Sequence, residues 1–119
     1  MKDNKIHGSN ESGVMIYDNG RGNLENNEIF GNGLSGVEIT TGAAPTLRSN
    51  RIFENKEAGI YVYQDGRGTL EDNEIVLNLR AGIRVSNSGN PTLRNNRTSK
   101  NAIVPSNTPM KGGGRVEAD

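Results

Sequence analysis

One spacing constrains this sequence more than any other feature: the same residue types return every 23 positions, without an insertion or a deletion. The unit reads approximately N-x-I-x-x-N-x-x-x-G-[VI]-x-[VI], followed by a more variable stretch that ends in a leucine. Its leading asparagine, its glycine and its leucine recur at Asn4, Asn27, Asn50, Asn73 and Asn96, at Gly13, Gly36, Gly59 and Gly82, and at Leu24, Leu47, Leu70 and Leu93. A strict period in this range predicts stacked structural repeats.

Apolar and polar residues alternate inside each unit, as in Val37-Glu38-Ile39. A period of two is typical of strands, and no i, i+3, i+4 pattern runs long enough for a helix. We expect three short strands per unit, around 47–49, 51–53 and 59–63 in the third unit. The 17 asparagines and 16 glycines gather at the joints, where left-handed or tight-turn backbone is needed. The predicted fold is all-β: a right-handed parallel β-helix (solenoid) of four 23-residue coils plus a decaying fifth.

Composition alone would favour disorder, because hydrophobic content is 31% and mean hydropathy is negative. The 23-residue period outweighs this compositional argument for disorder, since stacking joins the few aliphatic side chains of each unit into one continuous core. We predict a repeat domain over residues 1–104. Pro105 and Pro109 cannot donate to a continuing ladder, so residues 105–119 are predicted to be a terminator and a disordered tail.

Two columns of charge alternate in sign along the predicted stack. They contain Lys2, Glu25, Arg48, Glu71 and Arg94, and Lys5, Glu28, Arg51, Glu74 and Arg97. Each charge would have an opposite neighbour in the coils on either side, and a slip by one coil would bring like charges together. Exposed ion pairs are worth only about 0.2 to 1 kcal/mol each. We therefore interpret the columns as setting register more than stability.

Asparagines form two further columns, one at each of two bends. The first contains the leading asparagines of the units, and the second contains Asn32, Asn55, Asn78 and Asn101. Side-chain amides stacked at strand spacing can hydrogen-bond along a column and satisfy groups that the bend would otherwise bury unpaired. We predict a structural role for both columns.

Charge and cysteine content limit the function classes. With 14 basic and 14 acidic residues the formal net charge is zero, so we expect neither a nucleic-acid partner nor binding to an anionic membrane. Cysteine is absent, which excludes a disulfide framework and a thiolate zinc site and leaves the cellular compartment open. No apolar run approaches the length that a bilayer span needs.

The repeat unit resembles the parallel β-helix repeats of the group named for carbohydrate-binding proteins and sugar hydrolases. The alternation of N-P-T-L-R-N-N-R (90–97) with G-R-G-T-L-E-D-N-E-I (66–75) is similar, in more detail, to the β-helical region of F-box only ubiquitin-ligase receptors and to bacterial β-helix repeat proteins. The resemblance covers residues 3 to about 104. It implies the fold and a surface for a protein or a glycan. The chain has no F-box segment, so no ligase role follows.

Enzymes of this fold work with clustered carboxylates. Here Asp18, Asp65 and Asp72 are the aspartates of the repeat body besides Asp3, and Glu38 and Glu57 are isolated in the sequence. We therefore expect no catalytic residue, no metal site, no cofactor and no enzymatic activity. His7, the only histidine, is expected to be a solvated side chain, and the column of Phe30, Phe53 and Val76 is expected to pack in or just below the surface.

The outward face of the third strand of each coil holds all three tyrosines. We predict a binding face of Tyr17, Glu38, Tyr61, Tyr63 and Arg84, because tyrosine beside acid, base and hydroxyl is favoured at protein interfaces and sugar platforms. Strand propensity alone is the alternative explanation of the tyrosines. The expected function is a non-catalytic binding or scaffold module for a protein segment or a glycan. A fragment of a carbohydrate-active enzyme and a purely structural or idealised repeat protein stay open. The unpaired edge of the first coil predicts self-association through an end or a face.

Overall fold

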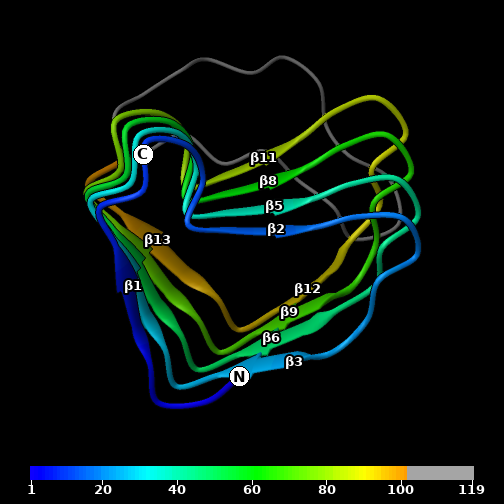
Figure 1. Cartoon of the computed structure of the whole chain (residues 1–119), viewed down its shortest axis with the longest axis horizontal. Helices are drawn as coiled ribbons and strands as arrows, with labels where there is room; N and C mark the ends of the chain where they lie inside the picture. Colours follow the sequence, from blue (N-terminus) through cyan, green and yellow to red (C-terminus); the bar gives the residue numbers. More distant parts are fainter. Residues whose placement is uncertain (102–119) are drawn as a thin grey trace.

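The computed structural model describes residues 1–101, which form strands and turns and contain no helix (Figure 1). The chain winds through successive coils that stack on one another as a parallel β-helix, with one strand on each of three sides. Among these residues no helix is long and apolar enough to cross a bilayer. The predicted end of the repeat domain at residue 104 and the predicted tail at 105–119 lie outside the described residues.

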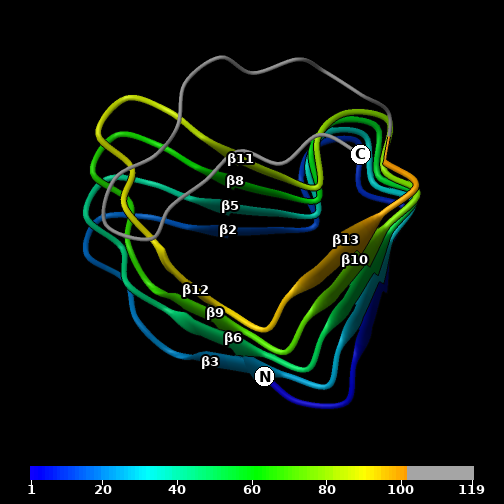
Figure 2. The same cartoon turned by 180° about the vertical axis from the view of Figure 1, so that it is seen from behind.

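Three parallel sheets make up the sides. The first sheet contains β1 (Lys5–His7), β4 (Glu28–Phe30), β7 (Arg51–Phe53), β10 (Glu74–Val76) and β13 (Arg97–Ser99). The second contains β2 (Val14–Ile16), β5 (Val37–Ile39), β8 (Ile60–Val62) and β11 (Ile83–Val85), and the third contains β3 (Asn23–Glu25), β6 (Thr46–Arg48), β9 (Thr69–Glu71) and β12 (Thr92–Arg94). Figure 2 shows β10 beside β13 from behind.

Every strand pairs with the strand one unit away, and all paired residues are 23 positions apart, as in Leu24 with Leu47 and Glu38 with Tyr61. The predicted 23-residue period therefore sets the register in which the strands pair in all three sheets. The three-strand coil is confirmed, with strands that begin and end within one or two residues of the expected positions.

A single narrow core runs along the stack. Inward side chains from the three sheets are fully buried in the middle coils, for example Ile52, Val62 and Leu70. Burying one such side chain stabilises the fold by about 1.5–3 kcal/mol. The inward residues of the outer coils, Ile6 and Leu93 among them, are only partly buried, because within residues 1–101 a neighbouring coil covers them on one side only.

Left-handed backbone occurs at the bends, but not where glycine and asparagine counts alone would place it. The residue just before each leading asparagine has a positive φ, and it is Asp3, Asn26, Ser49, Asp72 or Asn95. The leading asparagines themselves are not left-handed. The expectation that glycine and asparagine adopt the left-handed backbone conformation at the joints is thus wrong for the leading asparagine and for the repeated glycine of the unit.

The repeated glycine is required for space and not for φ. A Cβ on Gly59 would lie 2.5 Å from Ile75 Cγ2, 2.8 Å from the Gly82 carbonyl oxygen and 2.9 Å from Asn78 Nδ2. Gly36 is equally crowded, with Asn55 Nδ2 at 2.8 Å. Because the glycine column lies directly against the second asparagine column, a side chain there would push the amides out of line.

The asparagine columns are continuous hydrogen-bond ladders, as predicted. Asn32 donates both its backbone N–H (3.1 Å) and its Nδ2 (2.9 Å) to Asn55 Oδ1. Asn55 Nδ2 then donates to Asn78 Oδ1 (2.9 Å) and to the Ile29 carbonyl oxygen (3.3 Å). Each amide in the middle of the ladder therefore uses both acceptor and both donor positions, which explains how fully buried asparagines are tolerated.

The charge columns also align as predicted. The backbones of Lys2 and Glu25 form a parallel β-bridge. In the strands that follow, Arg48 is the register partner of both Glu25 and Glu71. Ion pairs close at 3.4 Å for Arg48–Glu71, Arg94–Glu71 and Arg51–Glu74, and at 4.0 Å for Lys5–Glu28. These side chains are largely exposed apart from Glu71, so each pair contributes little free energy.

Candidate binding face

The outward face of the second sheet carries the tyrosines. Met15, Glu38, Tyr61 and Arg84 occupy one row of register partners across β2, β5, β8 and β11. They face outward because Val37, Ile39, Ile60 and Val62, their neighbours in the chain, point into the core. Tyr17 and Tyr63 follow β2 and β8 directly and lie two coils apart.

Four of the five predicted residues meet in one group, which we name the tyrosine cluster: Glu38, Tyr61, Tyr63 and Arg84. The rings of Tyr61 and Tyr63 stack with centroids 4.3 Å apart and planes 24° apart. The Arg84 guanidinium lies 4.9 Å from the centre of the Tyr61 ring, a cation–π contact. Tyr17 is on the same face, but it is 55% exposed and separated from Tyr63 by one coil.

Hydrogen bonds fix both phenols. The Tyr63 hydroxyl donates to Glu38 Oε1 (2.7 Å), and the Tyr61 hydroxyl shares a bond with Ser86 Oγ (3.0 Å). The second carboxylate oxygen of Glu38 accepts from Ser12 Oγ. Glu38 thus ties the first coil to the third, and the rings are held in place before any ligand arrives.

The Tyr63 phenol is a poor proton donor near neutral pH. Partial burial, together with the hydrogen bond to Glu38 and the charge of that carboxylate, raises the pKa of Tyr63 from 10.0 to about 12. The neutral phenol can donate the hydrogen bond that the carboxylate needs, whereas a phenolate beside it would be repelled. Near neutral pH Tyr63 is therefore a neutral hydroxyl, held in position by its hydrogen bond to Glu38.

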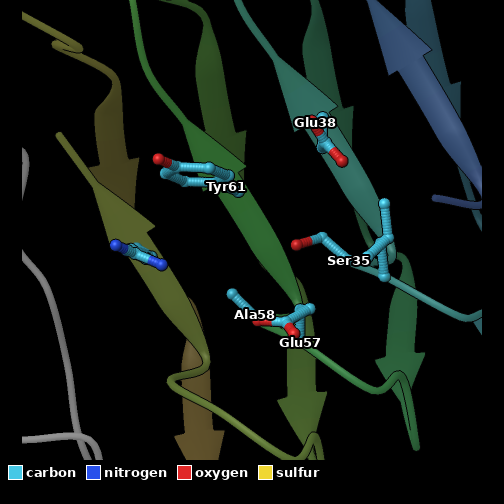
Figure 3. A pocket seen from close by; sticks show the side chains of 7 residues that line it. Ser35, Glu38, Glu57, Ala58 and Tyr61 are labelled. Atoms are coloured by element: carbon cyan, nitrogen blue, oxygen red, sulfur yellow. The ribbon is translucent and has the colours of Figure 1, made fainter. Parts of the chain in front are cut away.

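A hollow of about 190 Å³ opens beside the tyrosine cluster. Figure 3 shows its labelled side chains projecting from neighbouring coils to the same side. It is lined by Leu34, Ser35, Glu38, Glu57, Ala58, Tyr61 and Arg84. Glu38 and Glu57, although isolated in the sequence, line one hollow, because the turn before β8 brings Glu57 next to the outward row of the second sheet. Glu57 also pairs with Arg80 (3.7 Å).

Ser12 and Leu34 belong to this site and were not predicted. Ser12 bonds to a residue 26 positions away, and Leu34 lies in the turn before β5, so neither falls in a row of outward strand residues. The sequence held one signal for the hollow, which is the pair of positions just before the repeated glycine. Leu34 and Ser35 occupy this pair in one unit, and Glu57 and Ala58 occupy it in the next.

The aspartates considered for metal binding are far apart. Asp18 and Asp65 line one open depression of about 580 Å³ together with Asn19, Thr41, Gly42, Gln64 and Asn87. They are two coils apart, which is about 9.5 Å at ordinary strand spacing, whereas Ca²⁺ ligands lie at about 2.3–2.6 Å from the ion. Within residues 1–101 no three histidine, aspartate or glutamate side chains are grouped so that they could hold a metal ion.

A second group of aromatic side chains lies on the outward face of the first sheet. Phe30 stacks between His7 (4.8 Å, 8°) and Phe53 (4.9 Å, 9°), and the Arg51 guanidinium lies 4.4 Å from the centre of the Phe53 ring. The phenylalanines are half-buried, in line with sub-surface packing. His7 is exposed but not simply solvated, because its ring continues the stack.

Comparison with family models gives one result. The model of the right-handed beta helix region matches residues 1–114, nearly the whole chain. The chain belongs to the right-handed β-helix family. Neither the curated proteins nor the solved structures contain a significant match to it. Membership in the right-handed β-helix family fixes the fold and names no activity, so the finer similarity to F-box receptor repeats stays a prediction.

Proposed function

We propose that this right-handed β-helix is a non-catalytic binding or scaffold module that recognises a protein segment or a glycan on the outward face of the second sheet. The observation that carries the proposal is the stacked pair Tyr61–Tyr63, whose hydroxyls are tied to Ser86 and Glu38. Rings fixed in advance lose little conformational entropy on binding, so their contact area contributes directly to affinity.

Exposed side chains around the pair support the same function. Met15 and Tyr17 are 51% and 55% exposed on the same face, and Leu34 is exposed beside the hollow. Tyrosine, methionine and arginine are enriched at the centres of protein interfaces, and a flat aromatic platform also suits the apolar face of a sugar ring. Arg84 adds a cation at the rim of the hollow.

The test is a combined peptide and glycan array, followed by affinity measurement on every ligand found. The double substitution Tyr61→Ser/Tyr63→Ser should weaken binding at least tenfold, because it removes both rings of the platform. Phe30→Ser/Phe53→Ser is the matched control, since it removes the stacked pair of the first sheet and should leave the affinity unchanged. Unchanged binding by the tyrosine variant, with circular dichroism showing that it is folded, would overturn the proposal.

Further outcomes separate the alternatives. Turnover of polygalacturonate or alginate in the presence of calcium would replace a binding module by a carbohydrate-active enzyme. If no ligand binds, a purely structural role becomes the better explanation. Self-association through this face predicts a dimer in light scattering that Tyr61→Ser/Tyr63→Ser dissociates and that Phe30→Ser/Phe53→Ser does not.

A further inference from the structure

The outward side of the first sheet carries two rows of side chains, one charged and one largely aromatic. Ile29, Ile52 and Ile75 are fully buried, so their neighbours in each strand point outward. The charged row contains Lys5, Glu28, Arg51, Glu74 and Arg97, and the second row contains His7, Phe30, Phe53, Val76 and Ser99. We name the two rows together the first-sheet face.

The contacts inside these rows leave much of their surface uncovered. The ion pairs Lys5–Glu28 and Arg51–Glu74 close at 4.0 Å and 3.4 Å, but the four side chains keep between 40% and 73% of their surface accessible. The two phenylalanines are half-buried and stack with ring centroids 4.9 Å apart. The first-sheet face therefore offers positioned charges and aromatic rings to another surface.

The sign of the charged row changes at every strand, which limits how a second copy of the chain can lie on this face. A two-fold axis along the stack would place each strand opposite its own equivalent, and hence Glu28 opposite Glu28 and Arg51 opposite Arg51. A two-fold axis along the strands instead reverses the direction of stacking and keeps one charged row opposite the other. Whenever that axis passes midway between two strands, every acid faces a base.

One position of this axis also pairs the phenylalanines. With the axis midway between β4 and β7, Glu28 of each copy faces Arg51 of the other. Phe30 of each copy then faces Phe53 of the other. The next gaps on either side keep the charges complementary, but they place Phe30 opposite a residue other than phenylalanine. The charges and the aromatic rings therefore select the same axis.

We propose that the first-sheet face binds a second copy of the chain, antiparallel along the stack, about a two-fold axis midway between β4 and β7. The phenylalanines lose exposed apolar surface, and each facing charge gains an opposite charge from the other copy. Packed sheets lie about 10 Å apart, which lets the side chains of the two faces interdigitate. The tyrosine cluster lies on another side of the solenoid, so this interface is independent of the function proposed for it.

The first test measures the molar mass of the whole protein by sedimentation equilibrium over a range of concentrations. We expect a reversible dimer that weakens with salt, because three-residue strands give a small contact and salt screens the facing charges. Phe30→Ser/Phe53→Ser, shown to be folded by circular dichroism, should raise the dissociation constant at least tenfold. Tyr61→Ser/Tyr63→Ser should leave it unchanged. A monomer at the highest soluble concentration, or the opposite order of the two variants, would overturn the proposal.

A charge-inverted variant tests the register while it keeps the alternation within each copy. Every residue of the charged row is exchanged for one of opposite sign: Lys5→Glu, Glu28→Arg, Arg51→Glu, Glu74→Arg and Arg97→Glu. Two inverted copies are as complementary as two unaltered ones, whereas an inverted copy facing an unaltered one meets like charges at every position. Energy transfer between fluorescently labelled copies should show each protein pairing with itself and mixed pairs at least tenfold weaker.

The matched control inverts the charge column of the third sheet, which lies on another side of the solenoid. Its substitutions are Lys2→Glu, Glu25→Arg, Arg48→Glu, Glu71→Arg and Arg94→Glu. This variant should pair with the unaltered protein as tightly as with itself. Free mixing of the first-sheet variant with the unaltered protein would overturn the proposed register.

A zero-length cross-link identifies the axis. Lys5 and Glu74 lie in β1 and β10, three strands apart in one sheet, which is about 14 Å at ordinary strand spacing. A carbodiimide joins only an amine and a carboxylate in contact, so a link between these two residues must join two copies. In a mixture of unlabelled and isotope-labelled protein, mass spectrometry should find the link between chains of different label, and Lys5→Arg should abolish it. A dimer whose interchain link joins Lys5 to Glu28, or that lacks a link from Lys5, would overturn the proposal.

Discussion

The asparagine ladders and the charge ladders follow the same 23-residue period but stabilise the fold in different ways. The asparagines are buried, and each middle amide is bonded on all sides, as for Asn55 between Asn32 and Asn78. The charges are mostly exposed, and Arg48 keeps 52% of its side chain accessible while it pairs with Glu71. A buried amide without its partners costs far more than an exposed ion without its counterion.

The 23-residue period alone therefore does not show how much a column of residues contributes to the free energy of unfolding. The asparagine ladders hold the bends together, because removing one member leaves several buried groups unpaired at once. The charge ladders distinguish one register from another, because their alternation makes a slip unfavourable while each pair contributes little. Substitutions in the two kinds of ladder should differ accordingly in size and in salt dependence.

Breaking an asparagine ladder should have the largest effect. Asn55→Ala removes the acceptor of both Asn32 donors and the amide that donates to the Ile29 carbonyl, while Asn78 Oδ1 keeps only the bond from the backbone N–H of residue 55. We expect a loss of about 3–5 kcal/mol in the free energy of unfolding, because each buried unsatisfied group costs about 1–3 kcal/mol. Urea denaturation measures it. The control Asn90→Ala changes an exposed asparagine, and a loss for Asn55→Ala no greater than for this control would contradict the ladder's assigned role.

The glycine column beside that ladder should give the next largest effect. In Gly59→Ala the new methyl group meets Ile75 Cγ2, the Gly82 carbonyl and Asn78 Nδ2, all within 2.9 Å. We expect destabilisation of about 1–3 kcal/mol by overpacking, measured by the same urea titration.

Gly31 provides the control for this prediction. It has a positive φ and open space around its Cα, and the equivalent positions hold Glu54, Leu77 and Lys100 at similar φ. Gly31→Lys should therefore change stability much less than Gly59→Ala. The opposite order would mean that backbone conformation, and not crowding against the asparagines, explains the repeated glycine.

The sequence was sufficient for every feature that the period determines. Strand register, the core positions, both asparagine columns and both charge columns follow once residues 23 apart are superposed, and the structure has them so. Local propensity was less informative at the bends. It favoured left-handed glycine and asparagine, whereas Ser49 and Asp72 take that conformation and Gly59 is needed for close approach.

The candidate site could be predicted only in outline. Superposition places Glu38 beside Tyr61, but it does not say that the Glu38 carboxylate reaches Tyr63 and Ser12 on either side, 25 and 26 residues away. Those contacts depend on side-chain rotamers that cross between rows. The hollow at Leu34 depends in the same way on the path of a turn, which a strand pattern does not describe.

Reversing one charge should have a smaller effect. Arg48→Glu places three acids in succession with Glu25 and Glu71. We expect a loss of about 1 kcal/mol that shrinks as salt is added, because the pairs are exposed and screened. Arg48→Gln, which removes attraction without adding repulsion, should lose less. A melting temperature and a monodisperse fold unchanged in Arg48→Glu at low salt would count against a role of this column in register.

The smallest effect should occur at alkaline pH, in the hydrogen bond that joins the coils across the tyrosine cluster. The pKa of Tyr63 is raised from 10.0 to about 12, first by burial and then by Glu38, so the folded protein holds this proton more tightly than the unfolded chain does. The resulting contribution to stability is fully present below pH 10 and is lost as the pH rises from 10 to about 12. Tyr63→Phe lacks the titrating group, so its urea midpoint should fall less steeply over this interval than that of the unaltered protein. Tyr17→Phe is the control, because it removes an exposed phenol from the same face. If the urea midpoints of the unaltered protein and of Tyr63→Phe fall in parallel as the pH rises, the hydrogen bond to Glu38 orients the ring without contributing to stability. The tyrosine cluster would then be coupled to the rest of the solenoid only through its strands.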